Sequence, residues 1–595
     1  MSCNRRILVL FFVLIMISGN HCPVVAGNHP GEIAVAGTSV APELACSKDP
    51  LLEKAAALKE SLKNKGYRVR GRLDYNQYVE LDFIKLYCDG KIDSCNGNNS
   101  TNRYLTALVP PLPTQAETDL PFLFRIRRNE AVVLVGPTPP PCDYFSYVCL
   151  LFSRYDKGWG PNDTRKIFSS LGDPLNRFIL KTGGGDFDQD IVLVFTSDKK
   201  TNDAIKKAAM DAGFPKSVFN TFVIPSSLLR TNHALDKTTD ELVIGTRTAL
   251  WRDGTSDGGG YIENPGVVVF RVTPPDRNHD PFPTPLQMVR GTGRTEFDIG
   301  PSVEKLREAI LKRYSNLSAQ EHMTTQWVMQ SPIALQTMTN TLGDSSDAAY
   351  LITEQPFKLS DSPDDFLVIY GVNHKNSGKA VYHNIIIYQA YKYCGIASAY
   401  DHCYGPECVA FAGSAAEYLS NKDTGDIDQL YALKVARNCN GEPYCLEVPI
   451  AGCGKGTELD DDMHVGFRAY IEPESKSGPA YTELLFDRVV HFTAPPPVLE
   501  LDSKIVESHF PDPAEVSFKV SSTTPGDIRW EAEVEYVDDV NGARIEPNQG
   551  VISGGQGKGS FKLTGDHPGS YSLKITVKDQ QSRFAADEVR VLIQK

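Results

Sequence analysis

The sequence predicts an α/β (α+β) main body with mixed sheets and an internal duplication, followed by an all-β sandwich at the C-terminal end. A strand pattern in the first half of the chain returns in the second half, and a strand–helix–strand unit lies between the two copies. The final segment alternates apolar and polar residues in short runs. A chain of 595 residues exceeds what one hydrophobic core usually serves, so we expect about two or three domains.

The duplication is predicted from residues 122–155 and 365–389. In each stretch an apolar run ends at a glycine, a polar connection follows, and an aromatic residue opens a second apolar run. The second runs are apolar on both faces, which is typical of strands inside a sheet that is covered on both sides. The glycine and aromatic residues of the two copies are Gly136 with Tyr144 and Gly371 with Tyr382. We therefore expect the two stretches to occupy equivalent positions in two subdomains, residues 51–300 and 301–492.

Helices and one crossover are predicted from local patterns. Residues 191–197 form a β-run, residues 200–213 have helical spacing and end in Gly213, and residues 218–225 are apolar again. Strand, helix and strand at this spacing indicate a right-handed βαβ unit and hence a parallel pair of strands. Two further helices are expected over residues 51–65 and 302–314, where the apolar residues share one helical face.

The C-terminal sandwich is predicted for residues 498–595, after a Pro-rich linker over residues 493–497. Tyr571, Leu573, Ile575 and Val577 alternate with polar residues, as expected for strands with one buried face. The stretch GSYSLKITVKD resembles the last strands of PKD-like and other immunoglobulin-like modules of secreted proteins. The resemblance implies an immunoglobulin-like sandwich that serves as a spacer or adhesive unit, with Trp530 and Tyr571 in or beside its core. The segment contains no cysteine, so it lacks the disulfide that joins the sheets of antibody domains.

The N-terminal residues 1–26 are predicted to be a secretory signal. Arg5 and Arg6 precede an unbroken apolar run, residues 7–17, that is too short to span a bilayer. Residues 27–50 are expected to be a flexible leader. Because no later segment contains eighteen consecutive apolar residues, we expect no transmembrane segment and a secreted protein, extracellular or periplasmic.

The thirteen cysteines favour an oxidising compartment with several disulfides. They occur in an early and a late group, and an odd number follows the predicted signal, so at least one thiol should remain outside intramolecular pairs. If residues 144–152 form a strand, Cys142 and Cys149 lie about 23 Å apart. A disulfide needs Cα atoms within about 7 Å, so these two should not bond each other.

The net charge of −13 argues against nucleic acid and against an anionic membrane as partners. Alternate aspartates at Asp186, Asp188 and Asp190 are a weak Ca²⁺ candidate, because carboxylates are the ligands that this cation prefers. Charged residues on the exposed face of a starting strand are the alternative. We predict no other cofactor.

Two groups of residues are candidate binding sites. The first is the connection within the second copy, with His374, Lys379, Tyr382 and His383. It gathers imidazoles, a cation and a phenol at a strand end, where α/β proteins place ligands, although a polar hairpin turn explains the same residues. The second is the long Pro-rich loop over residues 271–296. It contains His279, Asp280, Arg290 and Arg294. The guanidinium groups of Arg290 and Arg294 could hold a carboxylate or sulfate, and structural ion pairs within the loop are the alternative.

These features favour recognition at the cell exterior, with polysaccharide or envelope components as the target class. The alternative is a secreted hydrolase centred on one of the two candidate sites, and a purely structural envelope component is a third possibility. A pocket with converging buried His, Arg or Asp groups would favour the hydrolase, whereas a flat aromatic surface would favour the binding protein.

Overall fold

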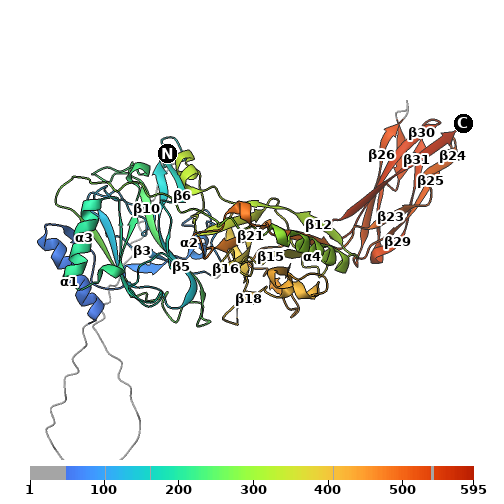
Figure 1. The fold of residues 1–595 in the computed structure, drawn as a ribbon. Coiled ribbons are helices and arrows are strands. Elements are labelled where there is room, and N and C mark those ends of the chain that lie inside the picture. Colours follow the sequence, from blue (N-terminus) through green and yellow to red (C-terminus); the bar gives the residue numbers. More distant parts are fainter. Residues whose placement is uncertain (1–48, 101, 161, 407, 538–541) are drawn as a thin grey trace, which may run out of the picture. The chain divides into compact units, whose positions relative to one another are not determined.

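The computed structural model describes residues 49–100, 102–160, 162–406, 408–537 and 542–595 (Figure 1). The predicted signal and most of the predicted leader lie outside these residues. The chain is mostly β, with 37% strand and 14% helix, so an α/β body is not confirmed. The apolar runs of the body are joined mainly by antiparallel pairing, which needs no helical crossover. Mixed sheets are present, because three of the body's sheets each contain a parallel pair.

The N-terminal half of the body contains two sheets. The first has the order β1 (Arg68–Arg70), β11 (Val268–Thr273), β4 (Ala131–Pro137), β8 (Asp190–Thr196) and β9 (Phe219–Val223). The second has the order β2 (Tyr78–Glu80), β3 (Tyr104–Ala107), β10 (Glu241–Trp251), β5 (Cys142–Tyr155) and β6 (Thr164–Ser170), and β7 (Leu175–Asn176) pairs with β5. The helices of this half are α1 (Pro50–Asn64), α2 (Phe83–Cys88) and α3 (Lys199–Asp211).

The C-terminal half of the body also contains two sheets. The first has the order β12 (Ser318–His322), β22 (Arg488–Thr493), β15 (Phe366–Val372), β19 (Leu430–Ala436) and β20 (Cys445–Glu447). The second has the order β13 (Thr324–Gln326), β14 (Ala348–Thr353), β21 (Met463–Tyr470), β16 (Tyr382–Gln389), β17 (Cys394–Tyr400) and β18 (Val409–Ala410). The helices of this half are α4 (Gly300–Arg313) and α5 (Ser331–Thr337).

The two halves repeat one topology. Strands β1, β11, β4, β8 and β9 correspond in order to β12, β22, β15, β19 and β20, and both sheets end in a parallel pair. The second sheets correspond in the same way, from β2, β3, β10, β5 and β6 to β13, β14, β21, β16 and β17. The predicted equivalence of residues 122–155 and 365–389 is therefore confirmed at the level of strand order. Helix α3, between β8 and β9, has no counterpart between β19 and β20, where the chain forms a short loop closed by the Cys439–Cys445 disulfide.

Local patterns explain the helices that the sequence predicts. Helix α1 starts after Asp49, whose side chain accepts hydrogen bonds from two backbone N–H groups of the first turn, and Pro50 occupies its first position. Helix α3 starts after Asp198 in the same manner and joins the parallel strands β8 and β9, which confirms the predicted βαβ unit. The predicted helix at residues 302–314 is α4, and it buries Val303, Leu306 and Ile310 as expected.

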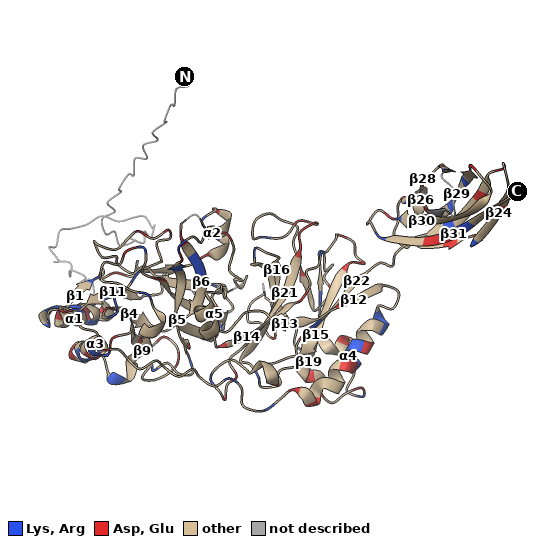
Figure 2. Cartoon of the chain, turned by 90° about the horizontal axis from the view of Figure 1, so that it is seen from above, with Lys and Arg blue, Asp and Glu red and all other residues tan. Residues whose placement is uncertain are grey.

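Figure 2 shows charged side chains on the helices α1, α3 and α4, on β6, on loops of the body and on the strands of the tail. The central strands β4, β5, β15 and β16 are buried along almost their whole length. This burial on both faces agrees with their continuous apolar sequences.

The tail is a sandwich of two sheets. One sheet contains β23 (Val498–Leu501), β25 (Ala514–Ser521), β29 (Gln556–Gly565) and β27 (Ala543–Glu546). The other contains β24 (Ile505–His509), β31 (Phe584–Gln594), β30 (Gly569–Lys578), β26 (Ile528–Val537) and β28 (Gln549–Ile552). Trp530 is 6% exposed and Tyr571 is fully buried, as predicted. No regular structure is present between β22 and β23, where the predicted Pro-rich linker lies, and the proposed domain boundaries remain predictions.

Four disulfides are present among the described residues. Two of them, Cys88–Cys453 and Cys95–Cys394, join the halves of the body, and Cys403–Cys408 and Cys439–Cys445 close short loops. Cys142 and Cys149 are buried free thiols, which confirms that they do not bond each other. These disulfides fit an extracellular or periplasmic protein. None of the described helices is long and apolar enough to cross a membrane.

Candidate functional site

Two arginines at equivalent positions connect the halves of the body. Arg247 on β10 donates hydrogen bonds to the carbonyl oxygens of Gly343 and Asp344 in the C-terminal half. Arg468 on β21 donates to the carbonyl oxygen of Gly97 in the N-terminal half. Each arginine pairs in register with a tyrosine on the neighbouring strand, Tyr104 for Arg247 and Tyr350 for Arg468. The contact between the halves is thus reciprocal, like the interface of a two-fold symmetric dimer.

The loops that receive these arginines are also equivalent. Gly97 precedes Tyr104 by the same number of residues as Gly343 precedes Tyr350. Both glycines have positive φ angles, 64° and 74°, and each lies against an aromatic ring of the body. A Cβ atom at Gly343 would lie 2.7 Å from the ring of Phe168, so only glycine fits there without a shift. Each loop therefore crosses to the other half in the same conformation.

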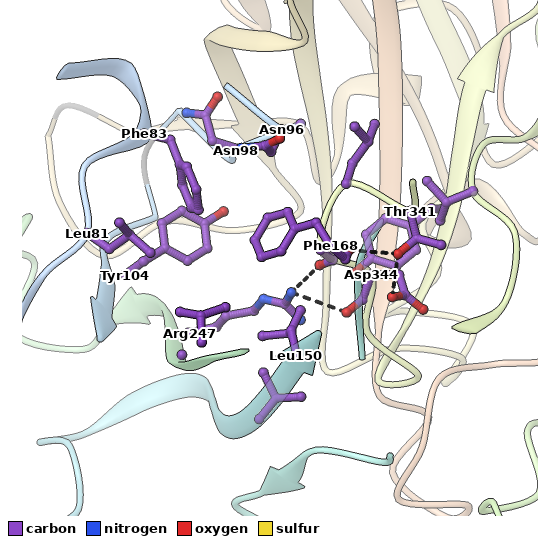
Figure 3. Close-up of a pocket in the computed structure, with 18 of the residues that line it drawn as sticks. Leu81, Phe83, Asn96, Asn98, Tyr104, Leu150, Phe168, Arg247, Thr341 and Asp344 are labelled. Carbon is purple, nitrogen blue, oxygen red and sulfur yellow. Dashed lines mark hydrogen bonds between the residues drawn. The ribbon is translucent and has the colours of Figure 1, made fainter. Parts of the chain in front are cut away.

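A small cavity of about 50 Å³ lies beside these contacts (Figure 3). Arg247, Arg468, Asn96 and Asp344 line it together with apolar and aromatic side chains. Among the described residues, the side-chain amide of Asn96, Nη1 of Arg247 and Nε of Arg468 have no hydrogen-bond partner. A polar cavity of this size holds water that can satisfy such groups.

Two buried carboxylates stabilise the loop of the C-terminal half. The Asp344 carboxylate accepts hydrogen bonds from the backbone N–H of Ser170 (3.0 Å) and from the hydroxyl of Thr341 (2.9 Å). The Asp347 carboxylate accepts hydrogen bonds from the hydroxyl of Tyr144 (3.0 Å) and from the amide of Asn176 (2.7 Å). Burial raises the pKa of both acids, that of Asp347 to about 7.

A larger groove of about 280 Å³ lies between the halves, next to the same loop. The segment 284–290 of the long Pro-rich loop forms one side, and residues 328–335 form the other. Aliphatic, methionine and proline side chains line the groove together with about as many polar side chains and the two tyrosines Tyr350 and Tyr481. Leu286 is 94% exposed and Met329 is 41% exposed at this groove. An apolar hollow with a few polar groups is the usual form of a ligand site.

Polar contacts fix the loop segment that forms the groove. The Arg290 guanidinium donates hydrogen bonds to the carbonyl oxygens of Ser346 (2.9 Å) and Ala348 (2.7 Å). Asp173 accepts hydrogen bonds from the backbone N–H of Met288 (2.7 Å) and from the hydroxyl of Ser346 (2.6 Å). Since Arg290 is used to hold the loop, it contributes to the shape of the groove.

His374 and His383, two of the residues that the sequence indicates, lie together in the core of the C-terminal half. His374 Nδ1 is 2.8 Å from Oε1 of Glu296, and His374 Nε2 is 3.6 Å from Oδ2 of Asp487. His383 Nε2 is 3.6 Å from Oδ1 of Asp487, which also accepts a hydrogen bond from the hydroxyl of Tyr431 (2.6 Å). Burial opposes charge on His374, but the two carboxylates raise its pKa to about 10, whereas burial lowers the pKa of His383 to about 4.

Lys379 lies in a neighbouring buried group. Its ammonium donates to carboxylate oxygens of Glu472 (2.9 Å) and Glu483 (2.6 Å). Glu483 also accepts hydrogen bonds from the backbone N–H groups of Thr292 and Gly293, which belong to the long loop. The structure therefore brings residues 292–293 of the second candidate loop against the Lys379 group of the first, although the two are far apart in sequence.

The other indicated residues do not join this group. Arg294 forms an exposed ion pair with Glu474 (3.3 Å), and Tyr382 stacks on Tyr470 with ring centroids 4.6 Å apart. His279 and Asp280 lie at the start of α3, where the Asp280 backbone N–H donates to the Asp198 carboxylate (2.7 Å). The Ca²⁺ candidates Asp186, Asp188 and Asp190 do not form a metal-type cluster among the described residues, and Asp186 pairs instead with Arg177.

A further histidine is held between two acids near the surface. His402 Nε2 is 2.5 Å from the Asp143 carboxylate, and its Nδ1 is 2.5 Å from that of Asp401. Burial opposes charge on this ring, but the two acids raise the pKa of His402 to about 9. The imidazole is therefore cationic at neutral pH.

Sequence reasoning missed several residues of these sites, namely Glu296, Asp487, Arg247, Arg468 and Asp347. Glu296 and Asp487 lie at the ends of loops, where acidic residues are common and carry no signal. The arginines did carry one, because each interrupts an apolar strand two residues after a glycine, Gly245 and Gly466, in corresponding strands. An arginine at the same position of two corresponding strands indicates a role that both halves share, here the contact between them.

Comparisons with known proteins add little to this geometry. No family model matches the chain, and no curated protein matches it. Among solved structures, the periplasmic chaperone SfaE matches with 10% identity and a TM-score of 0.14 over 16% of this chain. The match spans only 56% of that chaperone's chain. The PKD domain of an M14-like peptidase from a Thermoplasmatales archaeon matches with 17% identity and a TM-score of 0.12, over 17% of this chain and 93% of that domain.

One match extends over the body. An uncharacterized protein from Burkholderia cenocepacia covers 74% of this chain and 86% of its own, with 11% identity and a TM-score of 0.32. At these TM-scores the matches support no conclusion about function. The β-sandwich of the tail is established by its own two sheets.

Proposed function

We propose that this protein is a secreted recognition protein that binds an extended polypeptide of an extracellular or envelope partner in the groove between the two halves of the body. The observation that supports the proposal is the exposure of Leu286 and Met329 at an apolar groove. Large apolar side chains that remain exposed around a hollow mark binding sites in soluble proteins.

The lining of the groove favours a polypeptide over a polysaccharide. Methionine and proline side chains adapt to apolar side chains of different shape, and Gln287 and Gln330 can pair with a peptide backbone. A sugar ring is usually held against an exposed aromatic face, and the large exposed side chains at this groove, Leu286 and Met329, are not aromatic. A glycan is therefore the weaker choice for this groove.

The hydrolase alternative has less support. His402 is partly exposed and lies in a cluster of charged side chains. Its pKa of about 9 leaves the imidazole protonated at neutral pH, so it is a poor general base. His374 and His383 are buried within the core of the C-terminal half, with at most 1% exposure.

The proposal is tested by panning a random peptide display library against the full chain and measuring the selected peptides by titration. We expect peptides with apolar side chains. Each of the substitutions Leu286→Glu and Met329→Glu should weaken binding about tenfold or more, because burying one large apolar side chain contributes about 1.5–3 kcal/mol.

Val551→Glu is the matched control, because Val551 is 58% exposed on the sandwich and lies outside the groove. Peptides that bind all variants equally would contradict the proposal, and so would a library that yields no binder. Binding on a glycan array that is lost in the Leu286 and Met329 variants would instead show that the groove binds polysaccharide.

A further inference from the structure

The buried cluster around Asp487 has an internal comparison in the N-terminal half. Gly136 pairs with Ile191, and the equivalent Gly371 pairs with Tyr431. In the second sheets, Phe145 on β5 occupies the strand position that His383 occupies on β16. In the first sheets, Val267 precedes β11 where Asp487 precedes β22, so these two residues also correspond. A Cβ atom on Gly136 would meet Val267, and one on Gly371 would meet Asp487, so the two positions also correspond in space.

The fold itself does not require polar groups here. Phe145, Ile191 and Val267 are 0%, 3% and 4% exposed, and they fill the position with apolar atoms. Replacing buried charged groups by apolar residues is commonly neutral or stabilising. The C-terminal half nevertheless contains His383, Tyr431 and Asp487 at these positions, which indicates a role other than packing.

The distances within the cluster fit a shared ion better than direct hydrogen bonds. His374 Nε2 is 3.6 Å from Oδ2 of Asp487 and His383 Nε2 is 3.6 Å from Oδ1, so each imidazole faces its own carboxylate oxygen at a distance too long for a hydrogen bond. Two ligand atoms about 2.0–2.1 Å from one zinc ion lie about 3.3–3.6 Å apart. The ligand atoms of His374, His383 and Asp487 all lie within 4.8 Å of one another. Neither ring nitrogen of His383 has a hydrogen-bond partner among the described residues, and the same holds for Oδ2 of Asp487.

The groups around these ligands are those expected around a metal ion. Glu296 accepts from Nδ1 of His374 and thus directs Nε2 toward Asp487. Glu296 is itself held by the backbone N–H of Leu485 (2.9 Å). With neutral imidazoles, Glu296 and Asp487 contribute two negative charges, which one divalent cation would balance. A hollow of about 150 Å³ is lined by Asp487 and by its strand neighbour Gly371.

We propose that His374, His383 and Asp487 bind one divalent transition-metal ion, with Zn²⁺ as the favoured ion. Two imidazole nitrogens and one carboxylate oxygen are a common zinc ligand set, whereas Ca²⁺ and Mg²⁺ prefer oxygen ligands alone. The competing arrangement is a proton shared between His374 and its two acids, with no metal. The proposal is independent of the groove and its ligand.

The test uses the full chain, stripped with a chelator, incubated with Zn²⁺ and desalted, with metal content measured by mass spectrometry. We expect about one Zn²⁺ ion per chain and a rise of several degrees in the melting temperature. His383→Phe and Asp487→Val introduce residues that the N-terminal half already accommodates, and each should reduce the content to below about a tenth of an ion. His509→Phe, at an exposed site on the sandwich, should bind as the wild type does.

Binding of Co²⁺ gives a second readout that does not depend on the folding of a variant. Nitrogen and oxygen ligands in a four-coordinate site should give visible absorption that added Zn²⁺ abolishes. A wild-type protein that retains neither Zn²⁺ nor Co²⁺ would overturn the proposal in favour of the shared proton. Zn²⁺ retained at full content by folded His383→Phe and Asp487→Val would overturn it as well.

Discussion

Asp347 should make the stability of the body depend on pH. It is 2% exposed at the contact between the halves, and burial raises its pKa from 3.8 to about 7. Because the pKa in the folded state is raised, the contribution of Asp347 to stability is fully present below the unfolded pKa. It is lost as the pH rises through the folded pKa.

The size of the effect follows from the pKa difference. Since the pKa differs by about three units, the full change is about 4 kcal/mol, and about 2–3 kcal/mol of it falls between pH 5 and pH 8. Asp347→Asn cannot ionise; its carbonyl oxygen can still accept from Asn176, and its new amide nitrogen can donate to the Tyr144 hydroxyl oxygen. The difference in unfolding free energy between wild type and variant should therefore change by about 2–3 kcal/mol over this range, in favour of the wild type at low pH.

Urea unfolding of both proteins at several pH values measures this difference directly. Asp364→Asn, at an exposed position, is the control for a general change in charge. Its difference in unfolding free energy from the wild type should be the same at every pH between about 5 and 8. A difference for Asp347→Asn that does not vary between pH 5 and pH 8 would refute the reasoning, since the acid would then ionise equally in both states.

Three other predictions concern stability and chemistry. Arg468→Met should lower the unfolding free energy by about 1–3 kcal/mol, because the Gly97 carbonyl loses its charged donor and keeps only the longer hydrogen bond from the Tyr388 hydroxyl (3.3 Å). The exposed Arg529→Met should not have this effect, and equal stability of the two variants would contradict the reciprocal contact. Cys142 and Cys149 should be unreactive toward a thiol reagent in the native protein and reactive after denaturation without reductant, because both are buried and burial raises their pKa; fast native reaction would contradict this. Residues 498–595 should unfold cooperatively when expressed alone, because the sandwich has its own core, and a fragment without a melting transition would refute this.

Much of the fold was predictable because it depends on local pattern. The strands around Gly136 and Gly371 are continuous apolar runs, and the helices α1, α3 and α4 have clear apolar faces. The α/β character of the body was not predictable in the same way, since it depends on how strands pair. An apolar run such as β4 or β5 has the same sequence pattern whether its neighbours in the sheet are parallel or antiparallel.

The candidate sites were only partly predictable for a related reason. His374, His383 and Lys379 were found because they stand close together in one connection. Their partners Glu296 and Asp487 come from distant loops, and only the fold brings them within reach. The contact of Arg247 and Arg468 with the opposite loops likewise requires the two halves to be seen together.

Hydrogen–deuterium exchange of the full chain with and without a selected peptide tests most directly whether the groove is the ligand site. Protection should increase in residues 284–290 and 328–335, which form the two sides of the groove, and the sandwich at residues 498–595 should be unchanged. Protection confined to the sandwich, or spread over the body without these two segments, would contradict the assignment.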